Sequence, residues 1–154
     1  MHSPRNSLFA NRNFTLLFGG SSLSAIGDQF TLVALPWLVL KLTGDPAALG
    51  LVLAAMALPR AAFMLIGGAV VDRMSPRRVL LGARAVNALL VSVLAVLVLA
   101  GVIQMWMIYT LALGIGLSTA FAYPAGSAIL PQLIAPQQLQ PANALMMGMR
   151  QLSM

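Results

Sequence analysis

The amino-acid sequence predicts an all-α membrane protein with four transmembrane helices and the start of a fifth. Three observations support this fold class. Hydrophobic residues make up 60% of the 154 residues and charged residues only 8%, whereas a soluble domain carries about 25% charged residues. Four apolar runs are each long enough to cross a hydrocarbon core, which takes roughly 20 helical residues. The basic residues lie mostly outside these runs or near their ends, as loop charges do in membrane proteins.

The four predicted spans form a transmembrane region over residues 14–130. They cover about residues 14–40, 47–71, 79–103 and 105–130. The first connection, 41–46, is net neutral and rich in turn-forming residues. The second, 72–78, is short and strongly basic, and the third, around Gly101 to Trp106, carries no charge.

Residues 131–154 differ from the spans. Pro131, Pro136 and Pro141 punctuate a polar, Gln-rich linker. From Ala142 the chain regains helical, Met-rich character, but this stretch is too short to cross a membrane. The segment therefore predicts a linker and the beginning of a fifth helix, and we expect the chain to be the N-terminal part of a longer protein.

The distribution of Lys and Arg predicts the orientation. Basic residues precede the first span within residues 1–13, and four more surround the second connection: Arg73, Arg77, Arg78 and Arg84. The other two connections hold only Lys41. Because cytoplasmic loops carry the excess of Lys and Arg, residues 1–13 and 72–78 are predicted to be cytoplasmic. Four spans then return residues 131–154 to the cytoplasm.

Composition argues against several other functions. With no Cys, the sequence has neither a disulfide framework nor a thiolate metal site. The net charge of +6 comes without a basic patch interleaved with aromatic residues, so nucleic acid is not an expected partner. No nucleophile–base pair, metal-ligand cluster or nucleotide-binding loop emerges. We therefore predict no enzyme activity, no cofactor and no metal, with membrane lipid as the surrounding partner.

Asp28 and Arg60 are the ionisable residues deepest within the predicted spans. A charge near the bilayer centre costs at least about 2.5–3.5 kcal/mol, so its presence needs a reason. At the helical rise, Asp28 lies roughly 21 Å from the start of the first span and Arg60 about 17 Å from the end of the second. We hypothesise that Asp28 binds a cationic group or a proton, with Arg60 as its partner or as an anion contact. Alternatively, Arg60 snorkels and Asp28 caps a broken helix beside Gly27.

The segment between the second and third spans carries a motif. Gly67-Gly-Ala-Val-Val-Asp72-Arg73-Met-Ser-Pro-Arg77-Arg78 resembles the loop signature of the major facilitator superfamily, Gly-x-x-x-Asp-Arg-x-x-x-Arg-Arg. The resemblance implies that this is one part of the N-terminal six-helix half of a major facilitator fold. It also implies a conformational latch, in which the acid meets loop arginines and a helix N-terminus of the opposite half. The latch residues are Gly68, Asp72, Arg73, Arg77 and Arg78.

Further stretches resemble exporters of the macrolide-efflux and enterobactin-exporter type. They are residues 24–30 with 34–37, then 57–60, 123–131 and 142–144. This resemblance implies a secondary-active exporter of the bacterial inner membrane, proton-coupled, for amphiphilic or cationic small molecules such as drugs or siderophores. The partner would be the missing C-terminal half. One departure stands out, because residues 109–113, ahead of Gly114-Ile-Gly116, lack the Arg that many proton-coupled relatives carry.

Two alternatives remain open. The chain could be a self-sufficient small multidrug transporter of four helices that acts as a dimer around Asp28. It could also be a non-transporting, truncated membrane protein. The loop signature and the unfinished fifth helix favour the exporter portion.

Overall fold

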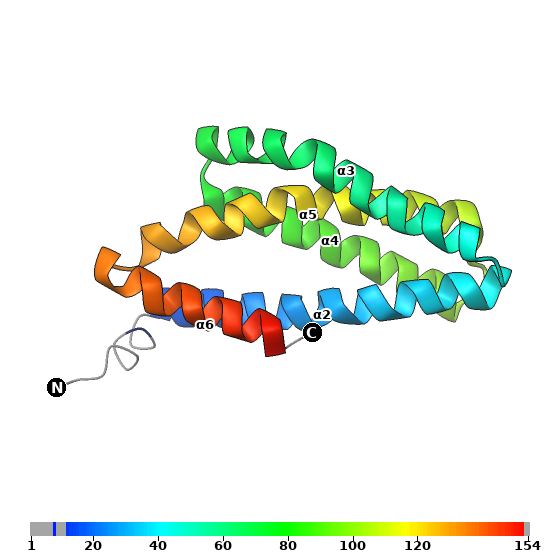
Figure 1. Cartoon of the computed structure of the whole chain (residues 1–154), viewed down its shortest axis with the longest axis horizontal. Helices are drawn as coiled ribbons and strands as arrows, with labels where there is room; N and C mark the ends of the chain where they lie inside the picture. Colours follow the sequence, from blue (N-terminus) through cyan, green and yellow to red (C-terminus); the bar gives the residue numbers. More distant parts are fainter. Residues whose placement is uncertain (1–7, 9–11, 153–154) are drawn as a thin grey trace. The chain divides into compact units, whose positions relative to one another are not determined.

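The computed structural model describes residue 8 and residues 12–152, and every regular element in that range is a helix. The helices in chain order are α2 (Arg12–Thr43), α3 (Pro46–Arg73), α4 (Pro76–Leu99), α5 (Met105–Leu133), η1 (Pro136–Gln138) and α6 (Leu139–Leu152) (Figure 1). Four of them, α2 to α5, contain stretches long and apolar enough to cross a membrane. The predicted all-α membrane fold is confirmed.

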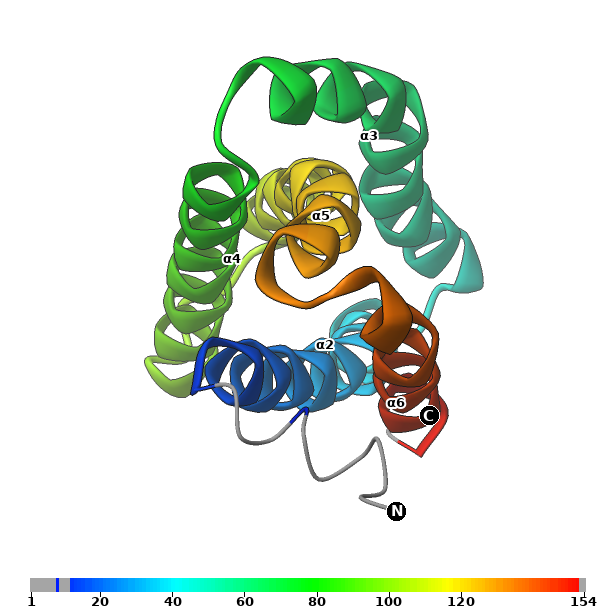
Figure 2. The ribbon, with the colours of Figure 1, turned by 90° about the vertical axis from the view of Figure 1, so that its left-hand side faces the viewer.

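The chain divides into two compact units. The first comprises Met1–Leu32 and Ala128–Met154, and the second comprises Val33–Ser127. In the described part of the first unit, α6 runs beside the N-terminal part of α2 (Figures 1 and 2). Its buried core consists of Leu8, Phe14, Leu130, Ile134 and Ala142. The ring of Phe14 also stacks on that of Phe18, with 6.1 Å between the ring centroids.

The turn between α2 and α3 is set by two residues. Gly44 takes a positive φ of 64° and donates its N–H to the Leu40 carbonyl at 2.8 Å, which ends α2. Asp45 accepts a hydrogen bond at Oδ1 from the Ala47 N–H, also at 2.8 Å, and so caps α3. Pro46 follows at the first helical position, where its missing N–H costs nothing.

The connection between α3 and α4 is shorter than the basic segment 72–78 suggested. α3 continues to Arg73 and α4 already begins at Pro76, so only Met74 and Ser75 lie between the helices. Arg73, Arg77 and Arg78, which the apolar pattern assigned to the connection, therefore belong to the two helices.

α4 ends at Leu99, before the predicted boundary at residue 103. Gly101 has a φ of 69°, its N–H bonds to the Val98 carbonyl at 3.1 Å, and the Val102 N–H bonds to the Leu97 carbonyl at 3.2 Å. This pair of bonds is a Schellman motif, which closes a helix at a left-handed residue. The apolar residues that follow Gly101 therefore belong to the connection.

The segment after α5 also differs from its prediction. α5 extends through Pro131 to Leu133, and α6 begins at Leu139 rather than near Ala142. Pro141 is accommodated because it lies in the first turn of α6, where the N–H groups have no partner within the helix.

In the second unit α5 lies between α3 and α4 (Figure 2). An apolar window of α5 is 39% buried, against 6% for those of α3 and α4. The buried core joins the end of α2 to the other three helices, and its members are Leu35, Val39, Ala48, Val52, Leu94, Ile108, Leu111 and Ala112. α5 is thus the central helix of this unit.

One face of α5 packs on α4 through small residues. A Cβ added at Gly114 would lie 3.0 Å from the Leu90 Cδ1, and one at Gly126 would lie 3.9 Å from the Leu80 Cδ1. Between them, Ser118 donates a hydrogen bond to Asn87 Oδ1 at 3.2 Å. The small residues at this spacing therefore allow close packing of helices in lipid.

A second face of α5 approaches the α3 backbone. A Cβ on Gly67 would lie 2.7 Å from the Ala120 carbonyl oxygen, and one on Gly116 would overlap the Met56 carbonyl. Each contact places a glycine of one helix against a carbonyl of the other. Because glycine has no side chain, the two backbones come together as closely as in other small-residue helix pairs.

We predict that Gly116→Ala destabilises the chain by about 1–3 kcal/mol, because the new methyl group overlaps the Met56 backbone. Gly82→Ala in α4 is the matched control, since a Cβ there meets open space. It should be neutral or stabilise by up to about 1 kcal/mol, the helix propensity difference. Unfolding of the detergent-solubilised chain, followed by circular dichroism, measures both. Equal stability of the two variants would contradict the close α3–α5 contact.

Candidate functional site

Asp28 lies near the middle of α2, roughly 24 Å from Arg12 at 1.5 Å per residue. Its side chain is half-buried and makes an interaction in the structure. α2 is continuous here, and the Thr31 hydroxyl donates to the Gly27 carbonyl at 3.1 Å. Because α2 has no break beside Gly27, the alternative in which Asp28 caps a broken helix is wrong. The carboxyl group lies within a membrane-spanning helix.

Arg60 lies at the middle of α3, roughly 21 Å from Pro46 and 20 Å from Arg73 along the helix. Its guanidinium carbon stands 4.5 Å from the centroid of the Tyr123 ring on α5, within the same unit. An Arg over an aromatic face is attracted by the ring quadrupole, by about 0.5–2 kcal/mol. The structure thus gives Arg60 an aromatic partner, and the snorkelling alternative stays a prediction.

Two prolines flank this pair. Pro59 directly precedes Arg60, and Pro124 directly follows Tyr123. Pro124 supplies no N–H to the Ala120 carbonyl, its normal helical partner, and that carbonyl is the one that faces Gly67 on α3. The backbone contact and the Arg–Tyr contact therefore occur together where both helices contain a proline.

The sequence placed Asp28 and Arg60 at similar depths and suggested an ion pair between them. Asp28 belongs to the first unit and Arg60 to the second, so the pair stays a prediction. Tyr123 was not among the predicted site residues. One sequence signal could have indicated Tyr123. It is a tyrosine followed by a proline in an apolar run, and that run also has to accommodate an arginine of a neighbouring helix.

Asn87 and Ser118 form a second polar contact inside the spans. Ser118 is 6% exposed, and its single hydroxyl hydrogen is shared between Asn87 Oδ1 and the Ile115 carbonyl of its own helix, whose oxygen lies 2.9 Å from Ser118 Oγ. A buried hydroxyl needs such partners because lipid offers none. The Ser118–Asn87 bond joins α5 to α4, so it helps to position the helix that carries Tyr123. Asn87 was not among the predicted site residues.

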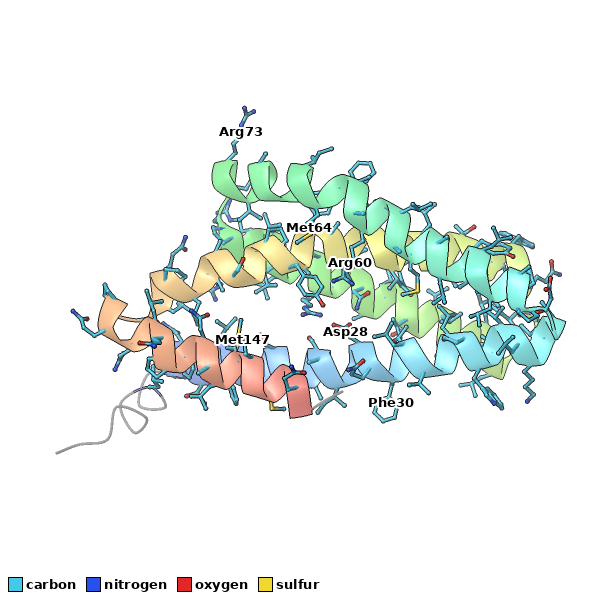
Figure 3. All side chains as sticks on the ribbon, in the orientation of Figure 1. Asp28, Phe30, Arg60, Met64, Arg73 and Met147 are labelled. Atoms are coloured by element: carbon cyan, nitrogen blue, oxygen red, sulfur yellow. The ribbon has the colours of Figure 1, made fainter. Side chains whose placement is uncertain are left out.

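The basic residues of the predicted latch are exposed at the α3–α4 hairpin. Arg73 is the last residue of α3 and extends away from it (Figure 3), while Arg77 and Arg78 lie in the first turn of α4. Cations at a helix N-terminus face the positive end of the macrodipole, which is unfavourable by about 0.3–1 kcal/mol each. Helix stability does not explain this placement. Gly68 is half-buried with open space beside it, and the side chain of Asp72 lies outside the described part.

A search of the described residues finds no group of three or more His, Cys, Asp or Glu side chains that could hold a metal ion. The chemical groups within the spans are instead a carboxyl group, a guanidinium on a tyrosine ring and an amide–hydroxyl pair. Such isolated polar groups inside a membrane protein typically bind or conduct polar ligands.

These features define a multi-pass membrane protein of the major facilitator type, with a basic hairpin between its second and third spans. Residues 4–150 match the major facilitator family described as transmembrane secretion effector, and the chain belongs to that family. The predicted resemblance to the superfamily is confirmed.

Two curated relatives are efflux proteins. The chain is 27% identical to macrolide efflux protein A of Streptococcus pyogenes over 126 residues, which cover 82% of this chain and 31% of that protein. It is 37% identical to the multidrug efflux pump Tap of Mycolicibacterium fortuitum over 111 residues, which cover 72% of this chain and 27% of that pump. The chain thus spans about a third of the length of these relatives. No solved structure gives a significant match.

We predict that Tyr123→Ala lowers the free energy of unfolding by about 1–2 kcal/mol, because Arg60 loses the aromatic face it contacts. Tyr123→Phe keeps the ring and should leave stability nearly unchanged. A double-mutant cycle with Arg60→Leu, measured by denaturant titration in mixed micelles, isolates the pair. Strictly additive effects of the two substitutions would show that the contact contributes nothing.

Proposed function

We propose that the chain is the N-terminal portion of a secondary-active exporter in the bacterial inner membrane. It would carry amphiphilic or cationic small molecules, such as drugs or siderophores, outward against a proton gradient. The family and the efflux relatives support the transporter class. The observation that carries the proposal is Asp28, a carboxyl group at the middle of a helix that spans the membrane.

A carboxylate within a membrane span is costly without a partner, and either a proton or a cationic group can compensate its charge. A proton and a cationic substrate group compete for the same site, because either one neutralises it. Binding of a proton from outside then favours release of the substrate, and loss of the proton inside favours its uptake. Asp28 therefore supplies the coupling expected of a proton–substrate antiporter, although α5 lacks the arginine found in many relatives.

The hairpin residues would act in conformational switching. In this proposal Gly68, Asp72, Arg73, Arg77 and Arg78 contact the C-terminal half and hold the cytoplasmic side closed. The exposure of Arg73, Arg77 and Arg78 supports it, since these side chains are accessible to a second half. Alternating access requires two halves that move around a central site. A chain of 154 residues alone should therefore not transport.

We predict that Asp28→Asn abolishes efflux by the product of the complete reading frame, because an amide neither releases a proton nor pairs with a cation. Drug accumulation in cells should rise to that of cells with the empty plasmid. Asp45→Asn is the matched control, since Asn caps a helix as well as Asp and residue 45 lies in a turn. Membrane levels are compared by immunoblot. Wild-type efflux by the Asp28→Asn variant would refute the role of Asp28.

The proposed orientation can be tested separately, because the chain contains no cysteine. We expect a cysteine at Ser75, between α3 and α4, to resist a membrane-impermeant maleimide in intact spheroplasts and to react after lysis. A cysteine at Gln104, between α4 and α5, should react in intact spheroplasts. Both positions are exposed, so accessibility reports the side of the membrane. The opposite labelling pattern would place the hairpin and the N-terminus outside.

A further inference from the structure

Arg60 brings a fixed positive charge to the middle of the membrane-spanning helix α3. Arginine stays protonated in proteins, so Arg60 cannot adapt to lipid by losing its proton. The face of Tyr123, 4.5 Å away, attracts the cation but carries no net negative charge. The position near the middle of α3 keeps lipid phosphates out of easy reach. An anion that reached this position would be strongly stabilised.

The chemistry of the guanidinium suits an oxyanion. Its planar fork can donate two parallel N–H hydrogen bonds, and a carboxylate has two oxygens that can accept them. Both side chains are accessible, because Arg60 is exposed and Tyr123 is 37% exposed. The exposed side chain of Met64 lies one turn further along α3 and adds an apolar surface (Figure 3).

We infer that Arg60 and Tyr123 form a binding subsite for the carboxylate of an amphiphilic substrate, with the apolar part of that substrate against the neighbouring helix surface. The inference rests on the proposed export function and extends its substrate class to molecules that carry a carboxylate. Arg60 makes the hydrogen bonds, and Tyr123 holds the guanidinium plane in position. Pro59 and Pro124 are the sequence neighbours of the two residues.

The test measures binding of 1-naphthoate to the chain in nanodiscs of neutral phosphatidylcholine by equilibrium dialysis. The neutral 1-naphthamide and the cationic 1-naphthylmethylammonium have the same ring system and isolate the contribution of the carboxylate. Empty nanodiscs give the partitioning into lipid. A second set of nanodiscs with added phosphatidylglycerol shows whether an anionic lipid headgroup occupies the same site, in which case it would weaken naphthoate binding.

We expect naphthoate to bind more tightly than either analogue and Arg60→Gln to weaken it by about tenfold to a hundredfold, the loss of charge-assisted hydrogen bonds. Arg60→Lys should weaken it less, because a point charge remains without the planar fork. Tyr123→Ala should weaken it and Tyr123→Phe should not. Arg12→Gln is the matched control, since it removes an exposed base at the start of α2. Circular dichroism and size-exclusion profiles establish that each variant is folded.

Three results would overturn the subsite: no naphthoate binding by the wild-type chain, equal binding by folded Arg60→Gln, or equal affinity for the amide. Competition by phosphatidylglycerol would assign the site to lipid and overturn its role for substrates. The efflux measurement is independent of these outcomes. Asp28-dependent export without Arg60-dependent binding refutes only the subsite, whereas Arg60-dependent binding without export refutes only the proposed function.

Discussion

α5 approaches both of its neighbours in the second unit because small residues occupy two of its faces. Gly114, Ser118 and Gly126 meet α4, while Gly116 and Ala120 meet the backbone of α3. In lipid the hydrophobic effect does not drive helices together, so close van der Waals contact and a few polar bonds have to do so. Larger side chains at these positions would separate the helices. Arg60 and Tyr123, which lie on different helices, would then no longer meet.

The same packing explains how the chain tolerates polar groups within its spans. Ser118 and Asn87 satisfy each other across the α4–α5 contact, and Arg60 is placed on a tyrosine ring. Each arrangement depends on two helices being held at a fixed separation, because lipid supplies no hydrogen bonds. Asp28 is held differently, on a long continuous helix. Polar chemistry and helix packing are therefore inseparable in this fold.

Much of the fold follows from elementary features of the sequence. Apolar runs predict the spans. The boundaries were less predictable, because hydrophobicity does not report hydrogen bonding. The Schellman motif ends α4 while Val102 and Ile103 continue the apolar pattern, and Arg77 and Arg78 are helical although they are charged. Asp28 and Arg60 stood out as charges among apolar residues. Tyr123 did not stand out, because its role depends on the contact with Arg60, which lies on another helix.

The placement of Arg77 and Arg78 at the positive end of α4 has an energetic consequence for anything that docks there. Repulsion between these cations and the helix dipole raises the energy of the undocked hairpin. A negatively charged surface that binds the hairpin offsets this repulsion. Because the undocked hairpin is higher in energy, the measured association is stronger than it would be without the repulsion. Dissolved salt relieves it too, within a Debye length of about 8 Å at physiological ionic strength. The repulsion stored in the undocked hairpin therefore depends on the ionic strength of the surrounding solution.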